Sequence, residues 1–186
     1  MENKTALLVM DLQNGIVSRL GDNDQLLLPF QKAVEAARQH NIPVIFVRVA
    51  FSEGYPEINP QNRAFSALKS VGGMTVSDIS TQIHELVKPE PNEPVVTKYR
   101  VSAFAGSNLE VILKAKQIDT LILSGISTSG VVLSTLREAA DKDYTIKVLS
   151  DACLDTDQEV HRVLTEKVFP RQAEVLTVDS WMESLE

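Results

Sequence analysis

The chain has 186 residues, of which 44% are hydrophobic and 23% charged, and this composition is that of an ordinary globular protein. Its formal net charge of −7 argues against a nucleic-acid partner, because such partners normally require a basic face. No apolar run approaches the roughly 20 residues of a membrane-spanning helix, and a single cysteine excludes an internal disulfide. We therefore expect a cytoplasmic protein with neither a nucleic-acid partner nor a membrane partner.

Six short apolar runs recur along the chain, and most are continuous in hydrophobicity rather than alternating. This pattern is typical of parallel strands that are buried on both faces. The predicted strands are 6–10, 44–47, 95–97, 121–123, 146–149 and 173–177.

Helical patterns separate the predicted strands. Their approximate ranges are 24–40, 76–87, 107–117, 128–142 and 157–167, followed by a short turn around Trp181. Ser107 with Glu110 has the spacing of a capping box, and Ser77 or Asp78 is suited to cap the second helix. The alternation predicts an α/β fold, a three-layer α/β/α sandwich with a Rossmann-like six-stranded parallel sheet, in one domain over residues 1–186.

The stretch 50–75 differs from the other connections, because it is turn-rich and long for a compact domain. Loops of this kind often cover or build a site. We expect Phe51 and Tyr55 to line a pocket for the substrate or to contact a neighbouring subunit. Two other aromatic residues, Phe65 and Phe104, are expected in the core.

Two charged residues follow predicted strands at the edge where ligands bind in open α/β sheets. Asp11 ends the first strand, two residues before Gln13, and Lys98 follows the third strand. Each also has a plain structural interpretation. Asp11 would cap the next turn, and Lys98 would lie along the surface with its ammonium group in water.

The fourth strand runs into a turn of small residues, Gly125-Ile-Ser-Thr-Ser-Gly-Val131, and then into a helix. Such a turn directs backbone N–H groups towards the carboxyl edge of the sheet, where they can bind an anion or support a nucleophile. The residues expected to contact a substrate here are Ser127, Thr128, Ser129 and Gly130. The alternative is a well-made helix cap, with Ser127, Thr128 or Ser129 as the N-cap.

Taken in order along the chain, these motifs resemble those of the isochorismatase-like cysteine hydrolases, the family that includes nicotinamidases. The matching pieces are Asp11 with Gln13, Lys98 with Ser102-Ala-Phe104, Gly125-x-x-Thr128, Thr135-x-Arg137-x-Ala139 and Ser150-Asp-Ala-Cys153. The resemblance extends from end to end and implies a six-stranded parallel sheet, usually in a homodimer or larger homo-oligomer. It also implies hydrolysis of small amides, of carbamoyl compounds or of the vinyl ether of isochorismate.

The resemblance further implies where the family's catalytic Asp, Lys and Cys would lie. The amidase triad falls on Asp11, Lys98 and Val131, so Val stands at the nucleophile position and is not itself catalytic. In the amidases a thiolate near Lys attacks the amide, and the carboxylate passes a proton to the leaving amine. Val131 removes that nucleophile but leaves the turn, with N–H donors near residues 130 and 131. The family's cis peptide bond would be Ile126–Ser127.

Other side chains offer a replacement nucleophile. Cys153 is the only thiol, but its position is commonly structural in the family, and a buried cysteine behaves as a small hydrophobe. A serine paired with Lys98 is chemically possible. The hydroxyls near the turn belong to Ser127, Thr128, Ser129 and Ser134. No histidine lies close in sequence to activate them, and the three histidines are expected at helix surfaces: His40, His84 and His161.

One branch of the family needs no thiol and offers a second mechanism. Its Asp protonates a vinyl ether carbon, and water attacks the resulting oxocarbenium ion. Burial would raise the pKa of Asp11, whereas Lys98 would lower it. Enzymes of this branch typically have Gly at the nucleophile position and bind an anionic dicarboxylate. The candidate anion ligands here are Lys98, Arg100 and Arg48.

Zinc-containing nicotinamidases of the family carry an Asp-x-His motif and a further His after the second strand. The corresponding segment here, 48–55, has no His. Glu53 and Glu57 alone are poor ligands for a transition metal. We therefore expect no metal and no other cofactor.

Two functional hypotheses follow from these residues. The first is a hydrolase that acts on a small-molecule substrate without a thiol nucleophile, with Asp11 as general acid/base and Lys98 as its electrostatic partner. The second is a catalytically inactive family member that binds a metabolite or serves as an oligomeric interaction protein.

Overall fold

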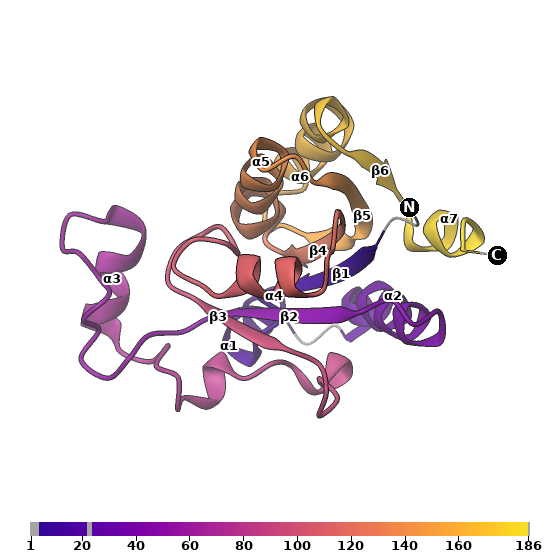
Figure 1. Ribbon diagram of the computed structural model, residues 1–186. Helices are drawn as coiled ribbons and strands as arrows, with labels where there is room; N and C mark the ends of the chain where they lie inside the picture. Colours follow the sequence, from indigo (N-terminus) through magenta and orange to yellow (C-terminus); the bar gives the residue numbers. More distant parts are fainter. Residues whose placement is uncertain (1–3, 22–23, 186) are drawn as a thin grey trace.

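The computed structural model describes residues 4–21 and 24–185 (Figure 1). Its centre is a sheet of six strands in the order β3-β2-β1-β4-β5-β6, and every neighbouring pair is parallel. The strands are β1 (Thr5–Met10), β2 (Val44–Val49), β3 (Val95–Lys98), β4 (Thr120–Ile126), β5 (Thr145–Leu154) and β6 (Glu174–Leu176). Each of the six predicted strands coincides with one of these, so the predicted sheet is confirmed.

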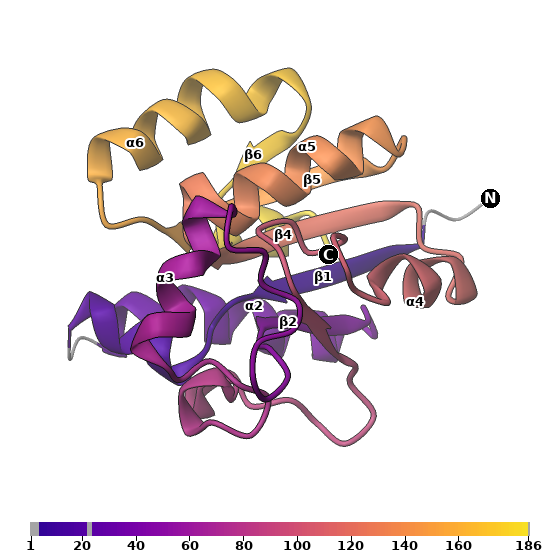
Figure 2. The same ribbon diagram turned by 90° about the vertical axis from the view of Figure 1, so that its left-hand side faces the viewer.

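Helices cover both faces of the sheet. They are α1 (Asn14–Val17), α2 (Leu28–Gln39), α3 (Arg63–Val71), α4 (Leu109–Ala115), α5 (Leu133–Asp141), α6 (Gln158–Val163) and α7 (Val178–Glu183). Buried residues of α4 and α5 join one apolar core, and those of α1, α2 and α7 join the other. Figure 2 shows α5 and α6 on the opposite side of the sheet from α2. The predicted three-layer α/β architecture is confirmed.

The central strand β1 shows how one sequence serves both cores. Ala6, Leu8 and Met10 belong to the core beneath α4 and α5, whereas Leu7 and Val9 belong to the core beneath α2. All five side chains are at most 1% exposed. The next residue, Asp11, therefore reaches the carboxyl edge at the middle of the sheet.

The predicted helix over 76–87 is wrong. Only two short 3-10 turns form there, Ile79–Thr81 and Glu85–Val87. Part of this main chain bonds to the connection after β1 instead, because the Asn14 N–H donates to the Gln82 carbonyl. The Asp78 carboxylate, expected as a helix cap, accepts from the N–H and the hydroxyl of Thr75. Contacts with distant residues thus override the local helical pattern.

The long connection after β2 contains a helix, α3, that the sequence did not predict. Asn62 caps it, because its side-chain oxygen accepts from the N–H groups of Ala64 and Phe65. No residue of α3 is fully buried, although its apolar residues recur at helical spacing, so the helix was missed despite a usable signal in the sequence.

Phe51 organises the same connection. It is fully buried, and its ring centroid lies 5.6 Å from that of Phe65 and 6.2 Å from those of Tyr55 and Tyr99. Phe51 is therefore the centre of a small core, and its predicted place in a pocket wall is wrong. Phe65 is only partly buried against this core, whereas Phe104 is buried as predicted.

The other predicted helices match in place but not in length. A 3-10 turn, Asp24–Leu27, precedes α2, and α6 continues into a π-helical stretch, Leu164–Val168, and a 3-10 turn, Phe169–Arg171. Asn108 precedes α4 as its N-cap, although the Ser107 hydroxyl does accept from the N–H of Leu109. Trp181 lies in α7 and is buried.

Within residues 4–21 and 24–185, no helix is long and apolar enough to cross a membrane.

Candidate active site

Asp11 and Lys98 meet at the carboxyl edge of the sheet, although β2 separates their strands. Asp11 directly follows β1, and Lys98 is the last residue of β3. The Nζ atom of Lys98 lies 3.0 Å from Oδ2 of Asp11. Asp11 is 5% exposed and Lys98 only 2%, so the alternative of Lys98 as a surface residue is wrong.

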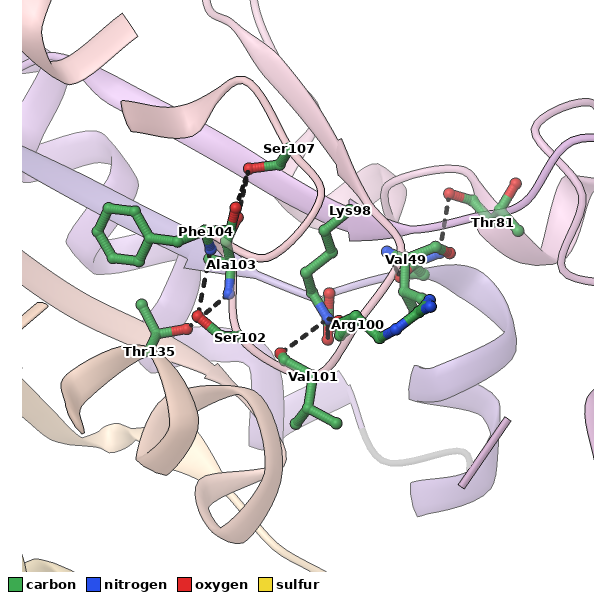
Figure 3. A network of polar contacts seen from close by, with 12 residues as sticks. Val49, Thr81, Lys98, Arg100, Val101, Ser102, Ala103, Phe104, Ser107 and Thr135 are labelled. Atoms are coloured by element: carbon green, nitrogen blue, oxygen red, sulfur yellow. Dashed lines mark hydrogen bonds and ion pairs between the residues drawn. The ribbon is translucent and has the colours of Figure 1, made fainter. Parts of the chain in front are cut away.

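The Lys98 ammonium group is fully engaged by the protein. Besides Asp11, it donates to the carbonyl oxygens of Arg100 at 2.9 Å and Val101 at 3.1 Å (Figure 3). An ammonium has three N–H donors, and these contacts use all of them. Lys98 therefore influences the site through Asp11 and has no donor left for a substrate anion.

The second carboxylate oxygen of Asp11 is different. Oδ1 is buried and has no hydrogen-bond partner among the described residues. Burial raises the pKa of Asp11, and the nearby Lys98 lowers it without reversing the rise. Desolvation therefore outweighs the ion pair, which the sequence left open. A carboxyl group with a raised pKa and an unengaged oxygen is suited to general acid/base chemistry.

The turn between β4 and α5 has the predicted cis peptide bond, Ile126–Ser127. A π-helical turn, Thr128–Val132, follows and leads into α5. Close packing explains its glycines: a Cβ on Gly125 would lie 2.7 Å from the Met10 carbonyl oxygen, and one on Gly130 would lie 2.7 Å from Oγ of Ser127. At Gly125 only glycine fits, because the obstructing atom belongs to the main chain of β1, whereas a Cβ on Gly130 would displace the Ser127 hydroxyl.

The predicted anion cradle is partly occupied by the protein itself. The Gly130 N–H donates to the Ser127 carbonyl at 3.2 Å, so the prediction that this group is open to a ligand is wrong. The Ser129 N–H donates to Oδ2 of Asp155 at 2.8 Å. Asp155 is 7% exposed and directly follows β5. It was missed in the sequence, although its place after a predicted strand was the available signal.

A histidine also contacts the turn. Nδ1 of His161 lies 2.8 Å from Oγ1 of Thr128, which is fully buried. His161 is on α6 but is partly buried, and the sequence could not reveal its contact with a turn 33 residues away. His40 at the end of α2 is exposed, and His84 caps a 3-10 turn through Nδ1.

Two other predicted substrate contacts have structural roles. Gln13 is fully buried, its amide nitrogen donates to the carbonyls of Val49 and Thr81, and its oxygen accepts from the Val49 N–H. Its amide thus joins β1, β2 and the segment before β3, which contradicts the predicted substrate contact. Tyr55 donates its hydroxyl to the Gly73 carbonyl at 2.8 Å and so closes the loop around α3.

Val131 and Cys153 both lie in the core beneath α4 and α5. Val131 is 2% exposed and Cys153 is 1% exposed. Burial raises the pKa of the Cys153 thiol to about 12. Such a thiol is almost entirely protonated at neutral pH, so Cys153 is a structural residue and does not replace the nucleophile.

The predicted anion ligands also have protein partners. The Arg48 guanidinium donates to the Thr97 hydroxyl and the Gln82 side chain, and that of Arg100 donates to the Tyr99 carbonyl. Within the described ranges, no three His, Cys, Asp or Glu side chains form a group able to hold a metal.

Known proteins resemble this chain over most of its length. The sequence model of the isochorismatase domain matches residues 5–180. An uncharacterized isochorismatase family protein of Bacillus subtilis (strain 168), YwoC, is 32% identical over 182 residues, which cover 98% of this chain and 94% of that protein. The ureidoacrylate amidohydrolase RutB of Pseudomonas savastanoi pv. phaseolicola is 31% identical over 171 residues, which cover 80% of this chain and 70% of that protein.

The fold has close structural relatives as well. The crystal structure of a cysteine hydrolase from Pseudomonas syringae pv. phaseolicola superimposes with a TM-score of 0.89 at 22% sequence identity, covering 98% of this chain and 92% of that one. The extent of the domain match and the identity to YwoC decide the classification: the chain belongs to the isochorismatase family.

Proposed function

We propose that this protein is a hydrolase that acts on a small-molecule substrate without a thiol nucleophile. The observation that carries the proposal is Oδ1 of Asp11, which is buried beside Lys98 with no hydrogen-bond partner among the described residues. The family relationship supports the reaction class, since a relative 31% identical to this chain is an amidohydrolase.

Asp11 is the general acid/base in this proposal. With its pKa raised by burial, it can take a proton from an attacking water through Oδ1 and return it to the leaving atom of the substrate. The Lys98 ammonium, 3.0 Å from Oδ2, stabilises the carboxylate while the proton is on the substrate.

Water is proposed as the nucleophile that attacks the substrate because Val131 cannot serve as one. By resemblance Val131 stands where cysteine hydrolases hold the nucleophile, and a valine side chain has no atom that can attack a carbonyl. Loss of a covalent nucleophile can cost roughly 10⁶-fold in rate in other hydrolases. A reaction that does not need a thiol is therefore proposed. It is either hydrolysis of an activated amide, or protonation of a vinyl ether carbon followed by attack of water on the oxocarbenium ion and release of the alcohol.

A second candidate function is ligand binding without turnover. The low exposure of the site favours it, since Asp11, Lys98 and Val131 are each at most 5% exposed and little of their surface is available to a reacting molecule. The Ser129 and Gly130 N–H groups are also already bonded within the protein.

The test starts from a screen of amides, ureido compounds and vinyl ethers by thermal shift, with each stabilising compound then recovered and analysed by mass spectrometry. For a compound that is hydrolysed, Asp11→Asn should lower kcat/KM by about 10²- to 10⁴-fold, because the acid/base group is lost. Asp119→Asn, at the opposite edge of the sheet, is the matched control and should retain full activity. Unchanged turnover by Asp11→Asn would refute the proposal, and recovery of every ligand intact would favour the binding protein.

A further inference from the structure

The segment that follows β3 wraps around Lys98 and is then fastened to α5. The carbonyls of Arg100 and Val101 accept from the Lys98 ammonium. The next two residues turn to the helix: the Ser102 hydroxyl donates to Oε2 of Glu138 at 2.6 Å, and the Ala103 N–H donates to the Thr135 hydroxyl oxygen at 2.9 Å. Figure 3 shows Thr135 facing Ser102 and Ala103, with Lys98 on the other side of the same loop.

These two anchors are part of the helix that begins at the turn. Thr135 and Glu138 come four and seven residues after Val131, a spacing that places side chains on one helical face. Thr135 is fully buried, and Ser102 is 8% exposed. The Ala103–Thr135 hydrogen bond is buried and the Ser102–Glu138 bond is partly buried, and bonds shielded from water hold a loop more firmly than surface contacts do.

We infer that Thr135 and Glu138 are positioning residues, which hold the loop carbonyls around the Lys98 ammonium and thereby keep that ammonium against Asp11. One helix would then carry both the position of Val131 and the anchors of the ion pair. The inference rests on the proposed roles of Asp11 and Lys98, and it adds two residues that act on the ion pair only through the loop after β3.

A positioning role can be distinguished from a purely structural role and from a purely electrostatic one. If Thr135 and Glu138 only stabilise the fold, their loss changes the melting temperature but not the ionisation of Asp11. If Glu138 acts through its negative charge alone, removing that charge lowers the pKa of Asp11, since a carboxylate ionises more readily without a neighbouring negative charge. Loss of positioning has the opposite sign, because a carboxyl group that loses its cation has a higher pKa.

The experiment follows the Asp11 carboxyl resonance against pH by NMR, in protein labelled with ¹³C at aspartate carboxyl groups and assigned with Asp11→Asn. Thr135→Val and Glu138→Met remove the two acceptors. Each should move the titration midpoint upward by about one pH unit, towards the value of Lys98→Met. Thr135→Ser and Glu138→Gln keep an acceptor and should stay at the wild-type midpoint.

Matched controls separate the positioning role from general damage. Thr120→Val removes a buried threonine hydroxyl at the opposite edge of the sheet and should leave the Asp11 midpoint unchanged. Unchanged midpoints in Thr135→Val and Glu138→Met would overturn the inference, as would an equal fall in Glu138→Met and Glu138→Gln. The measurement needs no substrate, so its outcome is independent of the turnover test of Asp11→Asn.

Discussion

At the scale of single residues, the two oxygens of the Asp11 carboxylate have unlike surroundings. Oδ2 contacts Lys98, whereas Oδ1 is buried without a partner among the described residues. An unsatisfied buried polar atom costs roughly 1–3 kcal/mol of stability, so its presence calls for a functional reason. Proton transfer to a bound molecule is such a reason, and a raised pKa fits it.

Val131→Cys tests whether the ion pair still has the arrangement of an amidase. In the amidase arrangement the introduced thiol faces the Lys98 ammonium group, and its pKa should then lie below the ordinary value of about 8.5, because an ammonium group stabilises a thiolate. The ultraviolet absorbance of the thiolate, followed against pH, measures it. The wild type serves as the blank, since the pKa of Cys153 is about 12.

Val132→Cys is the matched control for this substitution. Val132 is the next residue and is fully buried, so its thiol should have a pKa above the ordinary value. If the thiol introduced at position 131 titrates no lower than the one at position 132, the ion pair does not act on the nucleophile position.

The sequence predicted some of these residues for sound physical reasons. Asp11 and Lys98 end strands of one parallel sheet, so the carboxyl-edge rule brings them together. Gln13 and Phe51 were assigned to the substrate wrongly, because their burial depends on the loop between β2 and β3. Asp155 could have been suspected from its place after a strand.

At the scale of elements, Asp155, which follows β5, stabilises the turn between β4 and α5 by accepting a hydrogen bond from the Ser129 N–H. Although burial opposes its ionisation, hydrogen bonds led by the one from Ser129 keep the pKa of Asp155 below the ordinary value. A group with a lowered folded-state pKa stabilises the fold above its unfolded pKa, and this contribution is lost as the pH falls through the folded value.

Asp155→Asn should therefore reduce the free energy of unfolding by about 1–3 kcal/mol at neutral pH. The deficit should shrink below about pH 4, where the carboxyl group of the unfolded wild-type chain takes up a proton before that of the folded protein does. Urea denaturation at a series of pH values measures it, with Asp119→Asn as the control. A deficit that does not change with pH would show that the charge of Asp155 does not hold the turn.

Helices were harder to predict than strands for a physical reason. A strand of this sheet is marked by its own apolar side chains, as in β1. The segment 76–87 has apolar residues at helical spacing, but its main chain bonds to the β1–α1 connection and its Asp78 carboxylate to Thr75. The helix α3 is the converse case, because it forms without burying any residue completely.

At the scale of the whole molecule, the site lies between β1 and β4, where the order in which successive strands are added to the sheet changes direction. From β1 the chain proceeds outward to β2 and β3, then returns to the other side of β1 as β4. Ligands of open α/β sheets bind in the crevice at such a reversal. Asp11 and the turn after β4 flank this point. The assembly into a homodimer or larger homo-oligomer remains a prediction.

The pH dependence of kcat/KM on a substrate identified by the screen reports whether Asp11 is the acid/base group. If Asp11 is the acid/base group, kcat/KM must change with a midpoint equal to the titration midpoint of the Asp11 carboxyl in the free protein. That midpoint should lie above the ordinary aspartate value of about 3.9. A kcat/KM that stays constant while Asp11 titrates would exclude Asp11 as the acid/base group.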